Sequence, residues 1–326
     1  MRTAKELIQA SKAFTEENRF RSWYETLLTV ALAIAFVLVT FQSGLPLVVR
    51  IAASIISGLL YVRLFVIYHD YQHRAILQNS WTATQIMRFL GAYLLAPENI
   101  WKRSHEHHHN NNSKLTTAGI GSYPTISKAR FLQLRPEQKR LYLVNRHPLT
   151  IFFGYITLFI YWLNVKSMME SPRKSWDSIL ALAVHFAVSV WVWITLGPLT
   201  YALAWAFPFF LAFSIGAYLF YCQHNFPGAQ FRENQDWQYD YAALHSTSYM
   251  EMNPVMQWFT ANIGYHHVHH LNSRIPFYRL MEAQAHMPEL QNPLRTTWRP
   301  TDVARCLKLK LWDPEQKRMI TLAEIN

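Results

Sequence analysis

Cysteine is nearly absent from this chain, and so are the marks of several common protein classes. Its two cysteines among 326 residues, Cys222 and Cys306, give no disulfide framework and are expected to be inert thiols in a reducing compartment. No cleavable signal pattern precedes the first apolar run, because residues 1–21 are polar and contain five Lys or Arg residues. No internal repeat or low-complexity linker occurs, so we expect a single domain over residues 1–326.

Acidic residues are fewer than basic ones, with 20 Asp and Glu against 31 Lys and Arg, and the formal net charge is +11. Nucleic-acid binding is one explanation of such an excess, but the basic residues flank apolar blocks and match no nucleic-acid-binding module. Half of the chain (51%) is apolar, and these residues are gathered in long blocks. Membrane spans with cytosolic flanks that face anionic lipid explain the charge better.

Four apolar blocks are long enough to cross a bilayer, whose hydrocarbon core requires about 20 helical residues. They form two pairs, each joined by a short turn without Lys or Arg. The predicted spans are residues 23–41, 47–68, 179–196 and 199–222. Arg63, near the end of the second span, is expected to extend its side chain toward the interface. An amphipathic helix on the membrane is expected before the first span, and a cytosolic helical cap at 223–326. The fold class expected is an all-α integral membrane protein.

Two shorter apolar blocks, residues 81–96 and 150–165, are predicted to be interfacial or re-entrant. If 150–165 crossed the bilayer, histidine clusters on either side of it would lie on opposite faces of the membrane. The charges favour the same count, because 29 of the 31 Lys and Arg residues then lie on one side. We therefore expect the N-terminus, the histidine clusters and the C-terminus on the cytosolic side, at the inner membrane if the host is bacterial.

Histidine is concentrated in three short segments that hold eight of the 15 histidines at helical spacing. Two segments repeat the spacing i, i+3, i+4, which on a helix places three side chains on one face, where they can converge on one point. The third segment offers an i, i+4 pair. The candidate metal ligands are His69 and His73; His105, His108 and His109; and His266, His269 and His270. The last group is expected in the second half of a helix that begins at Pro254, with Phe259 and Ile263 on the same face.

Eight imidazoles in register are enough for two metal ions of about four ligands each. A structural zinc site needs only four ligands, and the clusters lack the Glu-x-x-His pairs of soluble di-iron bundles. Asp70 and Glu106 lie inside the clusters and are predicted to accept hydrogen bonds that fix ring tautomers; the alternative is that they are exposed helix charges. A redox-active metal pair beside apolar spans suits oxygen chemistry on an apolar substrate.

These segments resemble the HxxxH, HxxHH and HxxHH boxes of the membrane fatty acid desaturases. The resemblance extends from about residue 20 to the C-terminus, and residues 219–224 and 257–276 resemble the omega-6 and bacterial acyl-lipid branch. It implies a four-span fold, a site for two iron ions, and His224 as a ninth ligand, with His245 as the alternative to His224.

The implied reaction is the O2-dependent introduction of a cis double bond into a fatty acyl chain of a membrane lipid. No heme-binding His-Pro-Gly-Gly motif is present, so electrons are expected from a separate ferredoxin or b-type cytochrome. A basic cap suits a small acidic carrier of this kind, although lipid proximity explains the same charges. The carbon oxidised, the chain length, the acyl carrier, the natural donor and the oligomeric state stay open.

Two other functions are compatible with parts of the pattern. A fatty acyl hydroxylase or related monooxygenase on the same scaffold is the alternative, because desaturation and hydroxylation diverge only after the first hydrogen is removed. A histidine-rich metal transporter or sensor is a third possibility. Transporters place ionisable ligands near the bilayer midplane, whereas these boxes fall at the ends of spans, so the enzyme is favoured.

Overall fold

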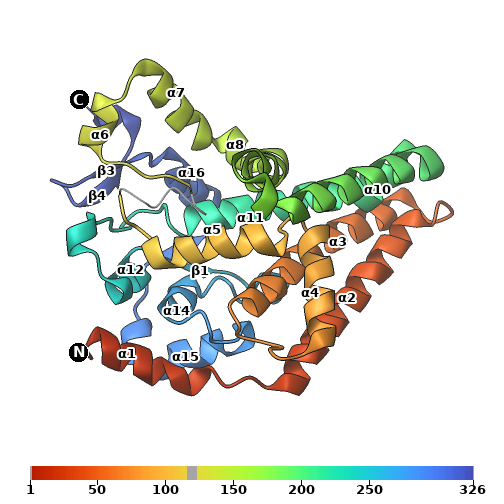
Figure 1. The fold of residues 1–326 in the computed structure, drawn as a ribbon, viewed down its shortest axis with the longest axis horizontal. Helices are drawn as coiled ribbons and strands as arrows, with labels where there is room; N and C mark the ends of the chain where they lie inside the picture. Colours follow the sequence, from red (N-terminus) through yellow and green to blue (C-terminus); the bar gives the residue numbers. More distant parts are fainter. Residues whose placement is uncertain (1, 116–122, 326) are drawn as a thin grey trace.

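The structure of the protein is a computed structural model that describes residues 2–115 and 123–325. Its described part is mostly helical, and Figure 1 shows the long helices running toward the right, with both chain ends on the left. The α-helices are α1 (Ala4–Ser11), α2 (Arg19–Phe41), α3 (Leu47–Gln72), α4 (Trp81–Tyr93), α5 (Glu98–Asn111), α6 (Lys128–Gln133), α7 (Pro136–Asn145), α8 (Pro148–Phe152), α9 (Ser167–Glu170), α10 (Trp176–Tyr201), α11 (Phe207–Cys222), α12 (Tyr239–His245), α13 (Pro254–Phe259), α14 (His266–Leu271), α15 (Leu280–His286) and α16 (Pro300–Lys308).

Shorter elements connect these helices. Two π-helical segments are η2 (Tyr155–Lys166) and η4 (Ala202–Ala206). The 3₁₀ turns are η1 (Lys12–Phe14), η3 (Pro172–Lys174), η5 (Asn234–Asp236), η6 (Phe277–Arg279), η7 (Pro288–Leu290) and η8 (Leu322–Glu324). The strands are β1 (Tyr249–Glu251), β2 (Arg295–Thr297), β3 (Leu311–Asp313) and β4 (Arg318–Ile320).

Three stretches of the described chain are long and apolar enough to cross a membrane: Arg19–Phe41, Leu47–Gln72 and Trp176–Cys222. The first two form a helical hairpin, and the Asn18 side chain caps the start of α2 by accepting a hydrogen bond from the Arg21 N–H. Helix α3 is largely buried, because α2 and α11 pack against it, whereas many large apolar side chains of α2 are exposed. An exposed apolar surface of this kind suits contact with lipid.

The third stretch is interrupted near its middle. Gly197 has φ 78°, a conformation that favours glycine, and Pro198 follows it without a backbone N–H. The Ser189 hydroxyl donates to Tyr201 Oη at 3.2 Å, although twelve residues would separate these two positions by about 18 Å along a straight helix. The chain therefore folds back here, and the predicted spans 179–196 and 199–222 meet at this bend.

Two buried arginines join the long helices. Arg50 donates from Nε to the Thr40 carbonyl and from Nη2 to Thr200 Oγ1, which ties the two hairpins together at their turns. Arg63 does not extend toward an interface as predicted. It is 2% exposed, forms an ion pair with Glu25 and lies over the Trp258 ring, because α2 and α13 cover it.

The two shorter apolar blocks form elements that run across the long helices. Helix α4 crosses α2 and α3 in Figure 1, and η2 is seen end-on. Neither element is among the stretches that are long and apolar enough to span a membrane. Their interfacial or re-entrant position remains a prediction.

The cap departs from the all-α prediction at two small sheets. Strand β1 pairs in parallel with β2, and β3 pairs antiparallel with β4, each over three residues. Strands this short leave no readable alternation in the sequence. Strand β1 packs against α14, which carries the third histidine box, so this sheet helps to position it, whereas β3 packs against α6.

The predicted helix from Pro254 to His270 is wrong, because the chain breaks into α13 and α14. Ala261 and Asn262 have φ 44° and 58°, left-handed values that end a helix. Gly264 follows, and a Cβ there would lie 2.6 Å from the Met250 carbonyl oxygen. Only glycine fits this close approach to β1, which places the start of α14 at His266.

Candidate metal centre

Four elements bring the nine predicted ligands into two adjacent clusters. The end of α3, helix α5 and helix α14 carry the three histidine boxes, and His224 follows the end of α11. In each cluster, one ligand nitrogen per residue lies within 4.8 Å of the others. The five-histidine cluster contains His69, His73, His105, His109 and His269, and the four-histidine cluster contains His108, His224, His266 and His270.

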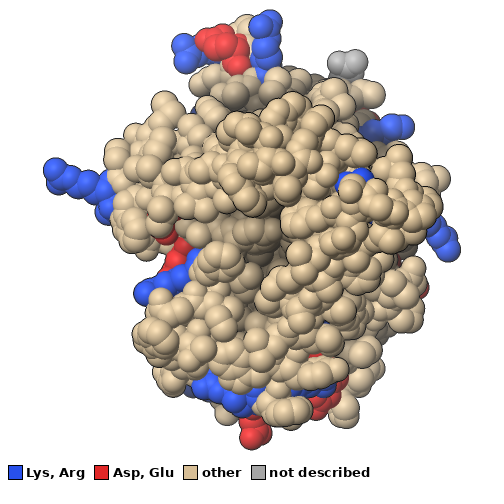
Figure 2. Space-filling model, turned by 90° about the vertical axis from the view of Figure 1, so that its right-hand side faces the viewer, with Lys and Arg blue, Asp and Glu red and all other residues tan. Residues whose placement is uncertain are grey.

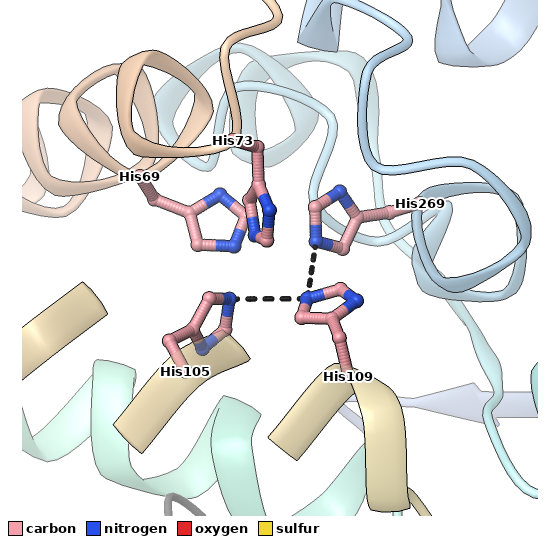
Figure 3. A group of neighbouring side chains, drawn as sticks. All are labelled: His69, His73, His105, His109 and His269. Carbon is pink, nitrogen blue, oxygen red and sulfur yellow. Dashed lines mark hydrogen bonds between the residues drawn. The ribbon is translucent and has the colours of Figure 1, made fainter. Parts of the chain in front are cut away.

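The five-histidine cluster is enclosed by three helices. Figure 3 shows rings from α3, α5 and α14 facing a common centre. The Nε2 atoms of His105 and His269 each lie 3.1 Å from Nε2 of His109. Four of the five side chains are buried, and His73 is partly exposed.

The four-histidine cluster is buried throughout. Nε2 of His224 and Nε2 of His266 are 2.9 Å apart, and the His108 ring centroid is 4.5 Å from that of His224. The two clusters touch, because the rings of His109 and His270 stack with their centroids 4.2 Å apart. The nine imidazoles thus form one continuous group with two centres.

The expectation that each i, i+3, i+4 group converges on one point is wrong. Helix α5 directs His105 and His109 to one cluster and His108 to the other, and α14 directs His266 and His270 to one cluster and His269 to the other. At about 100° per residue, positions i and i+4 differ by about 40°, whereas i+3 lies about 60° away on the other side of i. A helix that runs between two centres therefore serves both.

Burial favours the neutral form of seven ligand rings. Desolvation holds the pKa of six imidazoles on α5 and α14 well below 6.5, and neighbouring rings lower it further. The pKa of His224 is lowered to about 4 by burial. A neutral imidazole has one free lone pair, which is the form that ligates a metal.

Unpaired ring nitrogens support metal binding. Nε2 of His73, His108 and His270 is buried and has no hydrogen-bond partner within residues 2–115 and 123–325. Buried polar atoms without partners are uncommon in proteins, and a metal ion is one way to satisfy them. The donor set is nitrogen alone, which fits a pair of imidazole-binding transition metals.

Comparison with known proteins identifies the family. The sequence model of the fatty acid desaturase family matches residues 45–301, which is most of the chain. The chain is a member of the fatty acid desaturase family. Membership implies a di-iron centre and an oxidoreductase that desaturates fatty acyl chains, and the two histidine clusters are where this desaturase can hold its metals.

Curated relatives agree with this assignment. The desaturase is 28% identical to a fatty acid desaturase of Bacillus subtilis over 85% of this chain and 78% of the relative. It is 24% identical to an sn-1 oleoyl-lipid 12-desaturase of Anabaena variabilis, over 87% of this chain and 82% of the relative. It is also 24% identical to a chloroplastic omega-6 fatty acid desaturase of Spinacia oleracea, over 88% and 65%. All three names fit the desaturase interpretation rather than the hydroxylase alternative.

Asp70 supports the five-histidine cluster of the desaturase. Its Oδ1 lies 3.3 Å from Nδ1 of His69, and its Oδ2 accepts a 2.6 Å hydrogen bond from the Phe277 N–H. The carboxylate is buried, so it holds the ring and joins α3 to the cap. Glu106 is exposed, and no hydrogen bond or ion pair joins it to a ligand ring in the described chain. The exposed-charge alternative fits Glu106 better.

His224 belongs to no histidine box, and helical spacing alone could not have found it. Its position two residues after the expected end of a span was the only local signal. His245, the alternative ninth ligand, is exposed, and its ring packs on Tyr241 outside both clusters. The geometry therefore favours His224.

An apolar cavity extends from the clusters between α3 and α11. His69, His105 and His266 line its inner end, and its empty volume is about 540 Å³. Tyr61 also lines it, eight residues or about 12 Å along α3 from His69, and accepts a 2.6 Å hydrogen bond from the Tyr93 hydroxyl. Figure 2 shows that the right-hand end of the molecule is hollowed near its middle, with most of the charged side chains toward the rim.

Proposed function

We propose that this desaturase is an acyl-lipid desaturase that introduces a cis double bond into a membrane fatty acyl chain. It uses O2, two iron ions and electrons from a separate carrier, and works as one unit over residues 1–326. The observation that carries the proposal is the pair of buried histidine clusters at the inner end of an apolar cavity. The nine proposed iron ligands are His69, His73, His105, His108, His109, His224, His266, His269 and His270.

The protein's own part in this reaction is to hold the metal ions, to orient the acyl chain and to exclude bulk water. When bound, the iron pair supplies the oxidising power, drawn from O2, that removes two hydrogen atoms from adjacent methylenes. The histidines fix the metal positions, and Asp70 keeps His69 in one orientation. The apolar walls of the cavity hold the acyl chain against the centre and keep bulk water from it.

A glycerolipid is the substrate that the observations favour. One relative is named for acting on an oleoyl lipid, and the cavity is lined by apolar and aromatic side chains of α3, α11 and η2. About 12 Å of cavity along α3 is close to one leaflet of hydrocarbon, which is half of a core of about 30 Å. A single acyl chain therefore suits the length of the cavity.

Lipid analysis tests the proposal. A host without unsaturated acyl chains would express the wild-type protein together with a ferredoxin or b-type cytochrome and its reductase. Gas chromatography with mass spectrometry of the total lipids should show one new cis double bond, absent with the His269→Ala variant. A hydroxylated product, or saturated lipids only, would contradict the proposal.

We also infer four membrane crossings, α2, α3, α10 and α11, with the chain ends and histidine clusters on the cytosolic side. Both chain ends lie at the end of the molecule opposite the turns of the two hairpins, which supports this topology (Figure 1). The 47 residues of Trp176–Cys222 would make a straight helix of about 70 Å, twice what a bilayer requires. Labelling of single cysteines at Ser43 and Glu315 in intact cells tests it. Only the cysteine at position 43 should react with an impermeant reagent from outside.

A further inference from the structure

A second cavity lies beside the four-histidine cluster, on the other side of Phe220 from the apolar one. Phe220 lines both cavities, so its ring forms a wall between them. The second cavity is smaller than the apolar one and reaches His224. Its wall is rich in polar side chains, which are Asn112, Ser113, Tyr123, Thr125 and Asn225. The wall of the second cavity is therefore more polar than that of the apolar cavity.

Polar atoms around this cavity lack partners. The Tyr123 hydroxyl is buried and makes no hydrogen bond to the described chain, and neither does Nε of Arg146. Arg146 is fully buried behind the cavity wall, where it donates to Thr125 Oγ1 at 3.0 Å and to Asn225 Oδ1. No carboxylate pairs with this guanidinium in the described residues. Buried water commonly satisfies such groups where a cavity offers two or more polar partners.

The reaction of the proposed function requires protons at a buried site. Two C–H bonds break and one C=C bond forms, while O2 is reduced to two water molecules. The acyl chain supplies two hydrogen atoms, and two electrons and two protons must come from outside. The carrier delivers the electrons. The protons need a hydrogen-bonded route, because the ligand rings are at most partly exposed and the acyl cavity is walled mainly by carbon.

We propose that the second cavity holds water and conducts the two protons of each turnover to the four-histidine cluster, with the Tyr123 hydroxyl as a partner of that water. Phe220 separates this water from the acyl chain. The proposal rests on the proposed function. Its observations are the polar wall at His224 and the unpaired hydroxyl of Tyr123.

The Tyr123→Phe variant tests it, because the variant removes an oxygen that bonds to nothing in the described protein. A packing role predicts no change. The proton route predicts a fall in kcat of about tenfold with KM and iron content unchanged, and a larger solvent isotope effect on kcat. More than one O2 should be consumed per double bond, with hydrogen peroxide released. Tyr218→Phe is the matched control, since its hydroxyl is also buried without an oxygen or nitrogen partner in the described chain, away from this cavity.

A second readout does not depend on turnover. Protein loaded with Mn²⁺ alone should speed the relaxation of bulk water protons, because protons exchange between the cluster and solvent through the cavity. Tyr123→Phe should reduce this effect at equal Mn²⁺ content, and Thr125→Val should do the same if Tyr123→Phe does not accumulate. The proposal would be overturned if Tyr123→Phe matched Tyr218→Phe in three measurements. These are the water-proton relaxation, the solvent isotope effect on kcat and the O2 consumed per double bond. A wild-type protein that forms no double bond but shows the Tyr123-dependent relaxation would instead contradict the proposed function.

Discussion

The two histidine clusters are built from the same helices but are supported differently. The five-histidine cluster has one partly exposed member, His73, and a buried carboxylate, Asp70, against one of its rings. The four-histidine cluster is fully buried, has no carboxylate at its rings in the described chain, and borders the polar cavity through His224. One cluster thus has a ligand to spare and a carboxylate to orient it, whereas the other has neither. We expect the four-histidine cluster to be the more sensitive to the loss of a ligand.

Loss of a ligand from the smaller cluster should have the largest effect. His270→Ala leaves three imidazoles there, so we expect one iron per chain instead of two and at least a 100-fold loss of desaturation. Iron analysis of the purified protein and product analysis measure this. His245→Ala, which removes an exposed histidine outside both clusters, is the control and should keep full activity. If His270→Ala still bound two irons per chain, the four-histidine cluster would not be the more sensitive of the two to the loss of a ligand.

Loss of the partly exposed ligand from the larger cluster should cost less. His73→Ala leaves four imidazoles, a sufficient set for one ion, so both irons should bind at saturating iron while activity falls about 10-fold to 100-fold. Titration of iron into the metal-free protein, followed by assay, separates affinity from turnover. A loss as complete as that of His270→Ala would show that the fifth histidine is not spare.

Loss of the Asp70 carboxylate should lower the iron affinity of the five-histidine cluster only. Asp70→Asn keeps the shape but weakens the hold on His69, so the iron affinity of the five-histidine cluster should fall about 10-fold to 100-fold. Glu106→Gln makes the same chemical change at an exposed position and should alter neither affinity nor activity. Equal effects of the two variants would mean that Glu106 has the role that its position in the sequence suggested.

Lowering the pH should destabilise the folded protein through the histidines of both clusters. This effect should be small near neutral pH. In the metal-free protein, burial lowers the pKa of eight ligand rings below 6.5, so the unfolded chain binds more protons than the folded one below that pH. Stability should therefore fall as pH drops below about 6.5. Thermal unfolding of metal-free and iron-loaded protein between pH 7.5 and 5.5 tests this. A melting temperature of the metal-free protein that does not fall would contradict burial as the cause.

Local sequence patterns predicted which residues form this site better than they predicted how those residues are arranged in space. Helical spacing, i, i+3, i+4 in two boxes and i, i+4 in the first, marked the eight box histidines that lie in the two clusters, since helical side chains repeat every 3.6 residues. It did not predict the bend of the chain at Ala261 and Asn262, because the Gly264 contact that requires it is made with β1. Arg63 was misjudged for the same reason, since its partners Glu25 and Trp258 lie on other helices.

The amino-acid sequence by itself determined which side chains are present to bind metal, that they lie at the ends of apolar blocks, and which family they resemble. Only the tertiary structure decided that nine imidazoles divide into five and four, that His224 rather than His245 joins them, and that Phe220 lies between two cavities of different polarity. Spacing along one helix encodes the direction of a side chain around that helix. The point where it meets other side chains depends on how α3, α5, α11 and α14 pack, and no local repeat records that packing.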